Sequence, residues 1–145
     1  HDIDLIRYMF GKDPIIVYAQ GGMLKHDYED YASIFIEYGG DQEQIHAMIE
    51  VNWVTPYKIR RMEITGEKAV LILDFLTHTI NVYHEDGAYT PKITYIEPLY
   101  REDKNFVLAI LNKESPLITG HDGVIALRTC ETALKSMRSK MLEKI

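Results

Sequence analysis

The sequence predicts an α+β fold, in which an open, mostly antiparallel β-sheet of six or seven strands has its helices packed on one face. Helical periodicity occurs near both ends of the chain, whereas the residues between alternate between apolar and polar side chains, as half-buried strands do. Short connections rich in Gly and Asp favour antiparallel neighbours. A length of 145 residues suits one domain of ordinary size.

The first helix is expected at the very start of the chain. Ile3, Ile6 and Phe10 recur at helical spacing, and Gly11 stands where a left-handed C-terminal cap belongs. Residue 1 is already His1, so no Ser, Thr, Asp or Asn precedes the helix to cap it. We therefore expect the chain to be cut from a longer protein.

Three strands are expected after this helix. The apolar run at residues 15–18 follows a proline and ends at Gly21 and Gly22. Residues 32–38 and 45–53 alternate between apolar and polar side chains, so each strand has one wet face. Gly39-Gly40-Asp41 between them is typical of a tight connection, which predicts an antiparallel hairpin.

The middle of the chain is expected to extend the sheet. The apolar side chains of residues 59–65 change face, which indicates a bulge near residues 60–61. Residues 69–75 are apolar on both faces and are predicted to form a central strand covered on both sides. Residues 79–83 alternate and are predicted nearer an edge, and a last extended piece is expected at residues 93–96.

Two helices are expected to close the chain. One begins near Leu99, and the other begins near His121 after an acidic capping box made by Thr119 and Asp122. Cys130 lies beside the apolar stripe of the last helix and is interpreted as a buried structural thiol. The residues expected to form the buried stripes of the two helices are Leu99, Phe106, Val107, Ile110, Leu111, Val124, Leu127, Leu134, Met137 and Met141.

Composition excludes several classes of partner. Lys and Arg number 16 against 22 Asp and Glu, and the formal net charge of −6 would repel phosphate backbones, so no nucleic acid is expected. No apolar run is long enough to span a bilayer, so no membrane partner is expected either. One cysteine cannot form an internal disulfide, and a cytoplasmic location is therefore expected.

Few motifs that carry chemistry are found. The Gly-rich turns that hold nucleotides are absent, and the six His residues lack the spacing of a metal site, so the chain itself is expected to bind no cofactor and no metal. Trp53, Tyr57 and Lys58 gather where a strand ends, which is suited to holding a sugar or a phosphate. The alternative is that Trp53 continues the apolar face of its strand and packs.

The order of several short motifs resembles the C-terminal domain of the Gfo/Idh/MocA family, and within it the members similar to UDP-N-acetylglucosamine 3-dehydrogenases. The resemblance covers essentially the whole chain. The motifs are His1 to Arg7 with Gly11, Asn52-Trp53, Ile64 to Glu67, Glu97 to Leu99 with Phe106, and Pro116 to Gly123 with Ala133.

This resemblance implies that residues 1–145 are a single C-terminal substrate-side and oligomerisation domain, and that the N-terminal Rossmann domain is absent from the chain. Family members are NAD(P)-dependent oxidoreductases of sugars and cyclitols, so the parent protein is expected to oxidise a sugar or sugar nucleotide with NAD or NADP. The family's Asp-x-x-x-His aspartate and its Glu-Lys-Pro lysine are also missing. The chain alone is therefore expected to be inactive, because it cannot position the cofactor.

One residue is assigned by the same resemblance: His1 matches the family histidine beside the reacting hydroxyl and is expected to be the catalytic base. Trp53, Thr55 and Lys58 are expected to bind substrate, because their strand end would meet the missing cofactor domain.

The open face of the sheet is expected to pair with a second copy, because three helices can cover only one face. The residues expected to contribute to that uncovered face are Met48, Met62, Val70 and Ile72. An alternative interpretation is a stand-alone α+β module that binds a small ligand or dimerises without redox activity.

Overall fold

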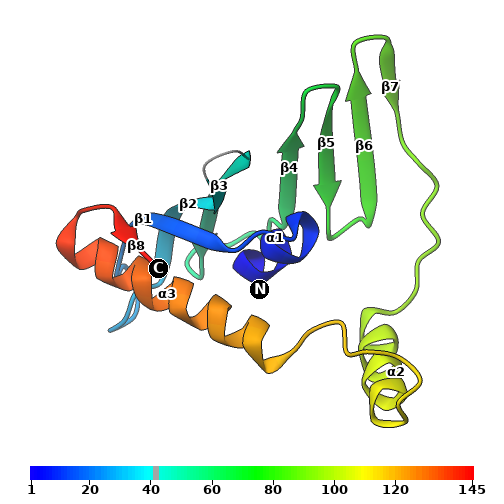
Figure 1. The fold of residues 1–145 in the computed structure, drawn as a ribbon. Helices are drawn as coiled ribbons and strands as arrows, with labels where there is room; N and C mark the ends of the chain where they lie inside the picture. Colours follow the sequence, from blue (N-terminus) through cyan, green and yellow to red (C-terminus); the bar gives the residue numbers. More distant parts are fainter. Residues whose placement is uncertain (41–42) are drawn as a thin grey trace. The chain divides into compact units, whose positions relative to one another are not determined.

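The computed structural model describes residues 1–40 and 43–145, which divide into two compact units (Figure 1). One unit contains residues 1–55 and 117–145, and the other contains residues 56–116. The predicted α+β class is confirmed. Within the described residues, however, the strands are divided between two four-stranded antiparallel sheets, one in each unit, and are not gathered in one sheet of six or seven strands.

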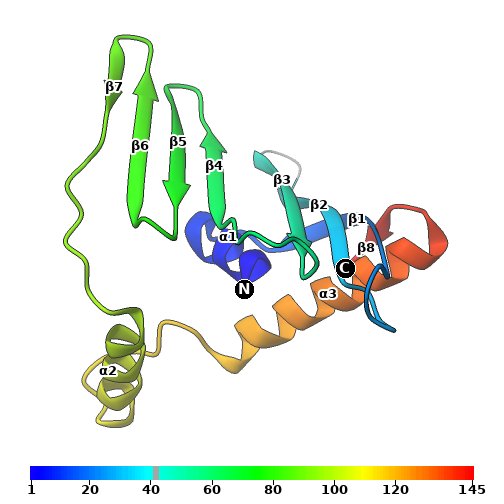
Figure 2. The same ribbon diagram turned by 180° about the vertical axis from the view of Figure 1, so that it is seen from behind.

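The first unit combines one sheet with two helices. Its sheet has the strand order β3-β2-β1-β8, and α3 packs against β1, as both ribbon views show (Figures 1 and 2). The elements of this unit are α1 (Asp2–Phe10), β1 (Pro14–Gly22), β2 (Tyr31–Gly40), β3 (Glu43–Asn52), α3 (Gly120–Ser139) and β8 (Glu143–Lys144).

Local signals at the start of the chain predicted α1 correctly. Ile3 and Ile6 are buried, and Gly11 caps the helix with a φ of 62°. Its backbone N–H donates to the Arg7 carbonyl oxygen over 2.8 Å. Because a side chain at this φ is strained, the glycine allows the sharp turn into β1.

Strand β1 continues through the two glycines that were expected to end it. Gly21 pairs with Ala32, and Gly22 pairs with Tyr31. A Cβ atom on Gly21 would lie 2.5 Å from the Tyr31 carbonyl oxygen and 3.0 Å from the Met137 side chain. The missing side chain is therefore what allows the strand to pass so close to its neighbours.

The predicted hairpin of β2 and β3 is confirmed. Ile34 lies opposite Ile49 in a continuous antiparallel register, so these two apolar side chains point to the same face of the sheet. Gly39 and Gly40 end β2, while Asp41 lies outside the described residues. The buried face of this sheet is formed by Val17, Ala19, Ile34, Ile36, Tyr38 and Ile49.

Helix α3 begins at the predicted capping box but buries a different face from the predicted one. Its buried residues are the small side chains Thr129, Ala133 and Ser136. Small residues permit close approach to β1, and the Ser136 hydroxyl accepts a hydrogen bond from the Ala19 N–H over 3.0 Å. The predicted buried residues Val124, Leu127 and Met141 are exposed, and so is Cys130, so its interpretation as a buried thiol is wrong.

The second unit holds the remaining strands and one helix. Its sheet has the order β4-β5-β6-β7, which confirms the interior position predicted for residues 69–75. The strand at residues 79–83 is also interior, because β7 covers its outer edge. The elements of this unit are β4 (Arg61–Thr65), β5 (Ala69–Asp74), β6 (Thr79–His84), β7 (Gly87–Tyr89) and α2 (Pro98–Ile110).

Three other expectations for this unit are wrong. Strand β4 starts only at Arg61 and pairs with β5 in unbroken register, so the predicted bulge is absent from the ladder. Residues 93–96 form no strand. All six residues of β5 remain partly exposed, so the predicted cover on both faces is incomplete.

The apolar residues of α2 were also expected to be buried, but no residue of this helix is. Its start is as predicted, since Pro98 occupies the first turn and the Glu97 carboxylate accepts the Leu99 N–H over 3.0 Å. Phe106 is 66% exposed, and Leu99, Val107, Ile110 and Leu111 are exposed with it.

The residues expected on one uncovered sheet face are in fact distributed over different surfaces. Met48 belongs to the sheet of the first unit, where it lies opposite Phe35. Val70 and Ile72 share a face of the second sheet, because strand neighbours two apart point the same way. Met62 pairs with Leu73 and therefore lies on the opposite face of that sheet.

Candidate functional site

A loop at residues 23–29 meets the end of β3 in the first unit, and Asp30 holds the two together. The Asp30 N–H donates to the Gly22 carbonyl oxygen over 2.9 Å, and the Trp53 N–H donates to the Asp30 carbonyl oxygen over 2.8 Å. The carboxylate of Asp30 accepts the backbone N–H groups of Leu24 and Lys25 at 2.9 and 2.7 Å. The Asp30 carboxylate thus fixes the backbone of the loop.

His26 completes this carboxylate cluster. Its backbone N–H donates to Asp30 Oδ2 over 3.1 Å, and its Nδ1 lies 3.2 Å from the same oxygen. Asp30 is only 3% exposed, and burial by itself raises the pKa of a carboxyl. The hydrogen bonds from the loop outweigh that burial and lower the pKa of Asp30 below its ordinary value. The carboxylate is therefore charged at neutral pH.

Three rings gather on the clamped loop and strand end. His26 stacks on Tyr28 with ring centroids 5.1 Å apart and planes 13° apart. Tyr28 meets Trp53 edge to face, with centroids 6.4 Å apart and planes at 88°. Trp53 is 76% exposed and Tyr28 is 52% exposed. Trp53 is therefore not buried against its own strand within the described residues.

The residues after Trp53 are fixed by side chains from both segments. Asn52 Oδ1 accepts the backbone N–H groups of Val54 and Thr55 at 3.3 and 3.0 Å. Lys25 Nζ donates to the Val54 carbonyl oxygen over 3.1 Å. Trp53 and Thr55 therefore belong to one ordered site, whereas Lys58 lies in the second unit, in the exposed segment before β4.

His1 occupies the N-cap position of α1, and its side chain makes no capping hydrogen bond. Its carbonyl oxygen accepts the Leu5 N–H over 2.8 Å, so the backbone at this residue is part of the first helical turn. The position of α1 is set further along the helix by Arg7. Arg7 Nε contacts Asp13 Oδ1 at 2.6 Å, and the guanidinium also pairs with Asp122.

Asp122 joins two of the motifs that were recognised separately in the sequence. Its carboxylate accepts the backbone N–H and the hydroxyl of Thr119, each over 2.6 Å, while also pairing with Arg7. The Thr119 hydrogen bonds and Arg7 lower the pKa of Asp122 to about 2. The capping box was predicted, but its ion pair with α1 was not, because the partners are 115 residues apart.

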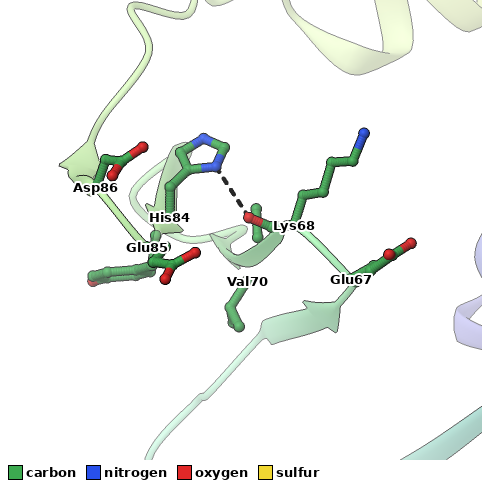
Figure 3. A pocket seen from close by; sticks show the side chains of 9 residues that line it. Glu67, Lys68, Val70, His84, Glu85 and Asp86 are labelled. Atoms are coloured by element: carbon green, nitrogen blue, oxygen red, sulfur yellow. Dashed lines mark hydrogen bonds between the residues drawn. The ribbon is translucent and has the colours of Figure 1, made fainter.

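A shallow hollow in the second unit contains none of the predicted site residues (Figure 3). It lies between the turn at residues 66–68 and the turn at residues 84–86. Nδ1 of His84 is 3.2 Å from the Lys68 carbonyl oxygen, and Figure 3 shows Glu85 and Asp86 on the other side of the hollow from Glu67.

Residues 1–40 and 43–145 contain neither a membrane-spanning helix nor a cluster of metal-ligating side chains. None of the helices found there is long and apolar enough to cross a membrane. Within the same residues, His, Cys, Asp and Glu side chains form no group of three or more that could hold a metal ion.

Comparison with known proteins places this geometry in a family. Residues 1–72, which include His1, Asp30 and Trp53, match the GFO/IDH/MocA C-terminal domain. Residues 1–72 of the chain belong to the Gfo/Idh/MocA C-terminal domain family. The resemblance seen in the sequence is thereby confirmed.

Relatives of this Gfo/Idh/MocA domain are oxidoreductases about twice its length. Inositol 2-dehydrogenase from Rhizobium meliloti (strain 1021) is 26% identical, over 97% of this chain and 46% of that protein. A UDP-N-acetylglucosamine 3-dehydrogenase from Acidithiobacillus ferrooxidans superposes with a TM-score of 0.87 at 23% identity, covering 96% of this chain and 45% of that one.

A third relative is the aldose-aldose oxidoreductase from Caulobacter crescentus, with a TM-score of 0.84 at 17% identity over 98% of this chain and 44% of that one. The chain thus spans less than half the length of each of these three relatives. At these levels of identity the two structural matches establish a common fold.

Proposed function

We propose that residues 1–145 form the single C-terminal, substrate-side domain of an NAD(P)-dependent oxidoreductase that acts on a sugar or sugar nucleotide. The observation that carries the proposal is the family match over residues 1–72, which contain His1 and Trp53. The names of the relatives support the substrate class, since they are dehydrogenases or oxidoreductases of an inositol, a sugar nucleotide and an aldose.

The parent protein is proposed to use NAD or NADP, which accepts the hydride removed from the substrate carbon. The chain itself is proposed not to hold that cofactor, because its sequence contains no Gly-rich turn of the kind that approaches a dinucleotide pyrophosphate. Its binding therefore falls to the rest of the parent. A cytoplasmic location is part of the proposal, which fractionation of cells that express the parent would test.

His1 is proposed to accept the proton of the substrate hydroxyl while hydride leaves the same carbon. A neutral imidazole accepts a proton readily near neutral pH, which is the property a general base needs. In the structure the His1 side chain does not cap α1, and the ion pair between Arg7 and Asp122 holds that helix against α3. The helix that carries His1 is thus anchored, and the imidazole is not committed to capping it.

Trp53, Thr55 and Lys58 are proposed to bind the substrate. We expect Trp53→Ala in the full-length parent to raise the KM for the sugar substrate about tenfold, which corresponds to about 1.4 kcal/mol of lost ring contact. The KM for the nicotinamide cofactor should stay unchanged. Steady-state kinetics with each substrate varied in turn measure both constants.

Tyr89→Ala is a suitable control for this experiment, because Tyr89 is an exposed aromatic residue of the second unit that also contacts another ring. It should leave both constants as they are. A Trp53→Ala enzyme with an unchanged KM for every sugar tested would remove Trp53 from the proposed binding site.

A homodimer formed through an exposed sheet face is also proposed. On the first sheet Tyr18, Phe35 and Met48 lie side by side across three strands, and Phe35 and Met48 are exposed. We expect light scattering at micromolar concentration to give twice the chain mass, with roughly 1,200 Å² or more buried in total. Met48→Asp should give the monomer mass, because it would bury an unpaired charge in the interface.

Leu127→Asp serves as the matched control, since Leu127 is an exposed apolar residue on α3. It should remain dimeric. A monomeric unmodified chain, or a Met48→Asp variant that keeps the double mass, would show that this face is not the interface.

A further inference from the structure

We propose that Tyr28 and Trp53 form a two-walled aromatic corner that binds an uncharged pyranose ring. The inference rests on the proposed function in taking Trp53 as a substrate contact, and it adds a second wall, Tyr28, together with a choice between ligand classes. The two ring planes stand at 88° with centroids 6.4 Å apart. A ligand seated there would contact the face of one ring and the edge of the other.

The corner is fixed before any ligand arrives. Asp30 ties the loop to the strand end through its carboxylate and its backbone, and His26 stacks on Tyr28 with planes 13° apart. Trp53 lies at the end of β3, and its backbone N–H donates to the Asp30 carbonyl oxygen. Little backbone freedom is then left to lose on binding, and preorganisation of this kind raises affinity.

The rings nevertheless remain open to solvent. Trp53 and Tyr28 expose 76% and 52% of their surfaces, although the backbone that carries them is ordered from within by a buried carboxylate. Large aromatic side chains usually bury most of their surface in a core or an interface. Two such rings held at right angles and left uncovered are suited to a ligand with an apolar face.

The charges around the corner favour a neutral sugar over a nucleotide. Exposed Asp27 and Glu29 lie on the same loop, and the buried Asp30 carboxylate is also charged. Lys25, the lysine of the loop, donates to the Val54 carbonyl oxygen and keeps its charge, so three carboxylates stand against one ammonium. A phosphate would be repelled here, whereas carboxylates accept hydrogen bonds from sugar hydroxyls. A pyranose supplies both the C–H face for the rings and the hydroxyls for the rim.

The single tryptophan of the chain makes the test direct, because all tryptophan fluorescence comes from Trp53. The chain is titrated separately with N-acetylglucosamine, glucose and uridine monophosphate. We expect a saturable fluorescence change with at least one of the two sugars, and at least about tenfold weaker binding of uridine monophosphate. The absence of a saturable change with both sugars, or tighter binding of the nucleotide, would overturn the proposal.

Two variants test whether Tyr28 contributes to sugar binding independently of Trp53. Tyr28→Ala should weaken sugar binding at least about tenfold, whereas Tyr28→Phe, which keeps the ring, should bind within about twofold of the unmodified chain. Because Tyr28 is half exposed, its truncation leaves the core intact, and circular dichroism checks this. If Tyr28→Ala bound the sugars as tightly as the unmodified chain, the proposal that Tyr28 is the second wall would be wrong.

Failure of the corner can be distinguished from failure of the proposed function. Sugar binding by this chain needs no cofactor, whereas the proposed function is read from NAD(P)-dependent turnover by the full-length parent. Turnover of a sugar by the parent, together with the absence of sugar binding at Trp53, would overturn the corner alone. Tyr28-dependent binding with a parent that oxidises no sugar would support the corner and overturn the redox role.

Discussion

Replacing His1 by Ala in the full-length parent is expected to lower kcat at least about tenfold, and by as much as about 10⁴-fold if general base catalysis makes its full contribution. The proton of the substrate hydroxyl would then have to pass to water while the hydride leaves. The KM for NAD or NADP should be unchanged, because the proposed role of His1 concerns the substrate hydroxyl and not cofactor binding. Initial rates with saturating cofactor measure the effect.

Thermal unfolding distinguishes this role from a structural one. The His1 side chain makes no capping hydrogen bond to α1, so His1→Ala should unfold at the same temperature as the unmodified parent. His121→Ala is the matched control, because His121 is an exposed histidine in the first turn of α3. It should keep full turnover. If His1→Ala also turned over at the normal rate, the assignment of a base would be rejected.

Ser136→Ala is expected to lower the free energy of unfolding by about 1–3 kcal/mol, the usual consequence of leaving a buried polar group without its partner. The Ser136 hydroxyl is fully buried between strand and helix. It accepts the Ala19 N–H over 3.0 Å and donates to the Met141 carbonyl oxygen over 2.6 Å. Urea denaturation followed by circular dichroism measures the change.

Thr132→Ala provides the comparison for this variant. Thr132 lies one turn earlier on the same helix and donates to the Arg128 carbonyl oxygen over 2.8 Å, but it is not buried. Its replacement should change the free energy of unfolding by no more than about 0.5 kcal/mol. Equal urea midpoints for the two variants would mean that the buried hydroxyl does not stabilise the contact between α3 and β1.

The elements that the sequence predicted correctly are those defined by neighbouring residues. Gly11 ends α1, Thr119 and Asp122 start α3, and the alternation of residues 32–38 and 45–53 places the hairpin. Each of these signals acts within a few residues of the feature it determines. Local patterns therefore suffice to find where these elements begin, end or pair.

Several of the errors concern which surface is covered, and coverage depends on partners distant in sequence. Apolar spacing on α3 predicted burial of Leu127, which is 61% exposed, because the helix instead presents Thr129, Ala133 and Ser136 to β1. The small side chains carry a weaker periodic signal than Leu or Met, yet they allow the closer approach. The apolar stripe of α2 likewise gave no information about whether anything covers it.

The candidate site was partly predictable for the same reason. Trp53 and Thr55 stood out as an aromatic and a polar residue at a strand end, but Tyr28 and Asp30 were missed. Asp30 precedes β2 after a loop of polar residues, and an Asp in that position often accepts nearby backbone N–H groups. That signal was available in the sequence, whereas the perpendicular contact of Tyr28 with Trp53 required the fold.

The first unit is built from both ends of the chain, with the second unit between them. Val17 and Ala19 of β1 are buried on the sheet that α3 contacts, and α3 is synthesised only after residues 56–116. The hydrogen bond between Ala19 and Ser136 closes a separation of 117 residues. During synthesis, the side chains of β1 that α3 covers therefore stay exposed until that helix emerges, whereas the strand ladder of residues 61–89 already has all its partners.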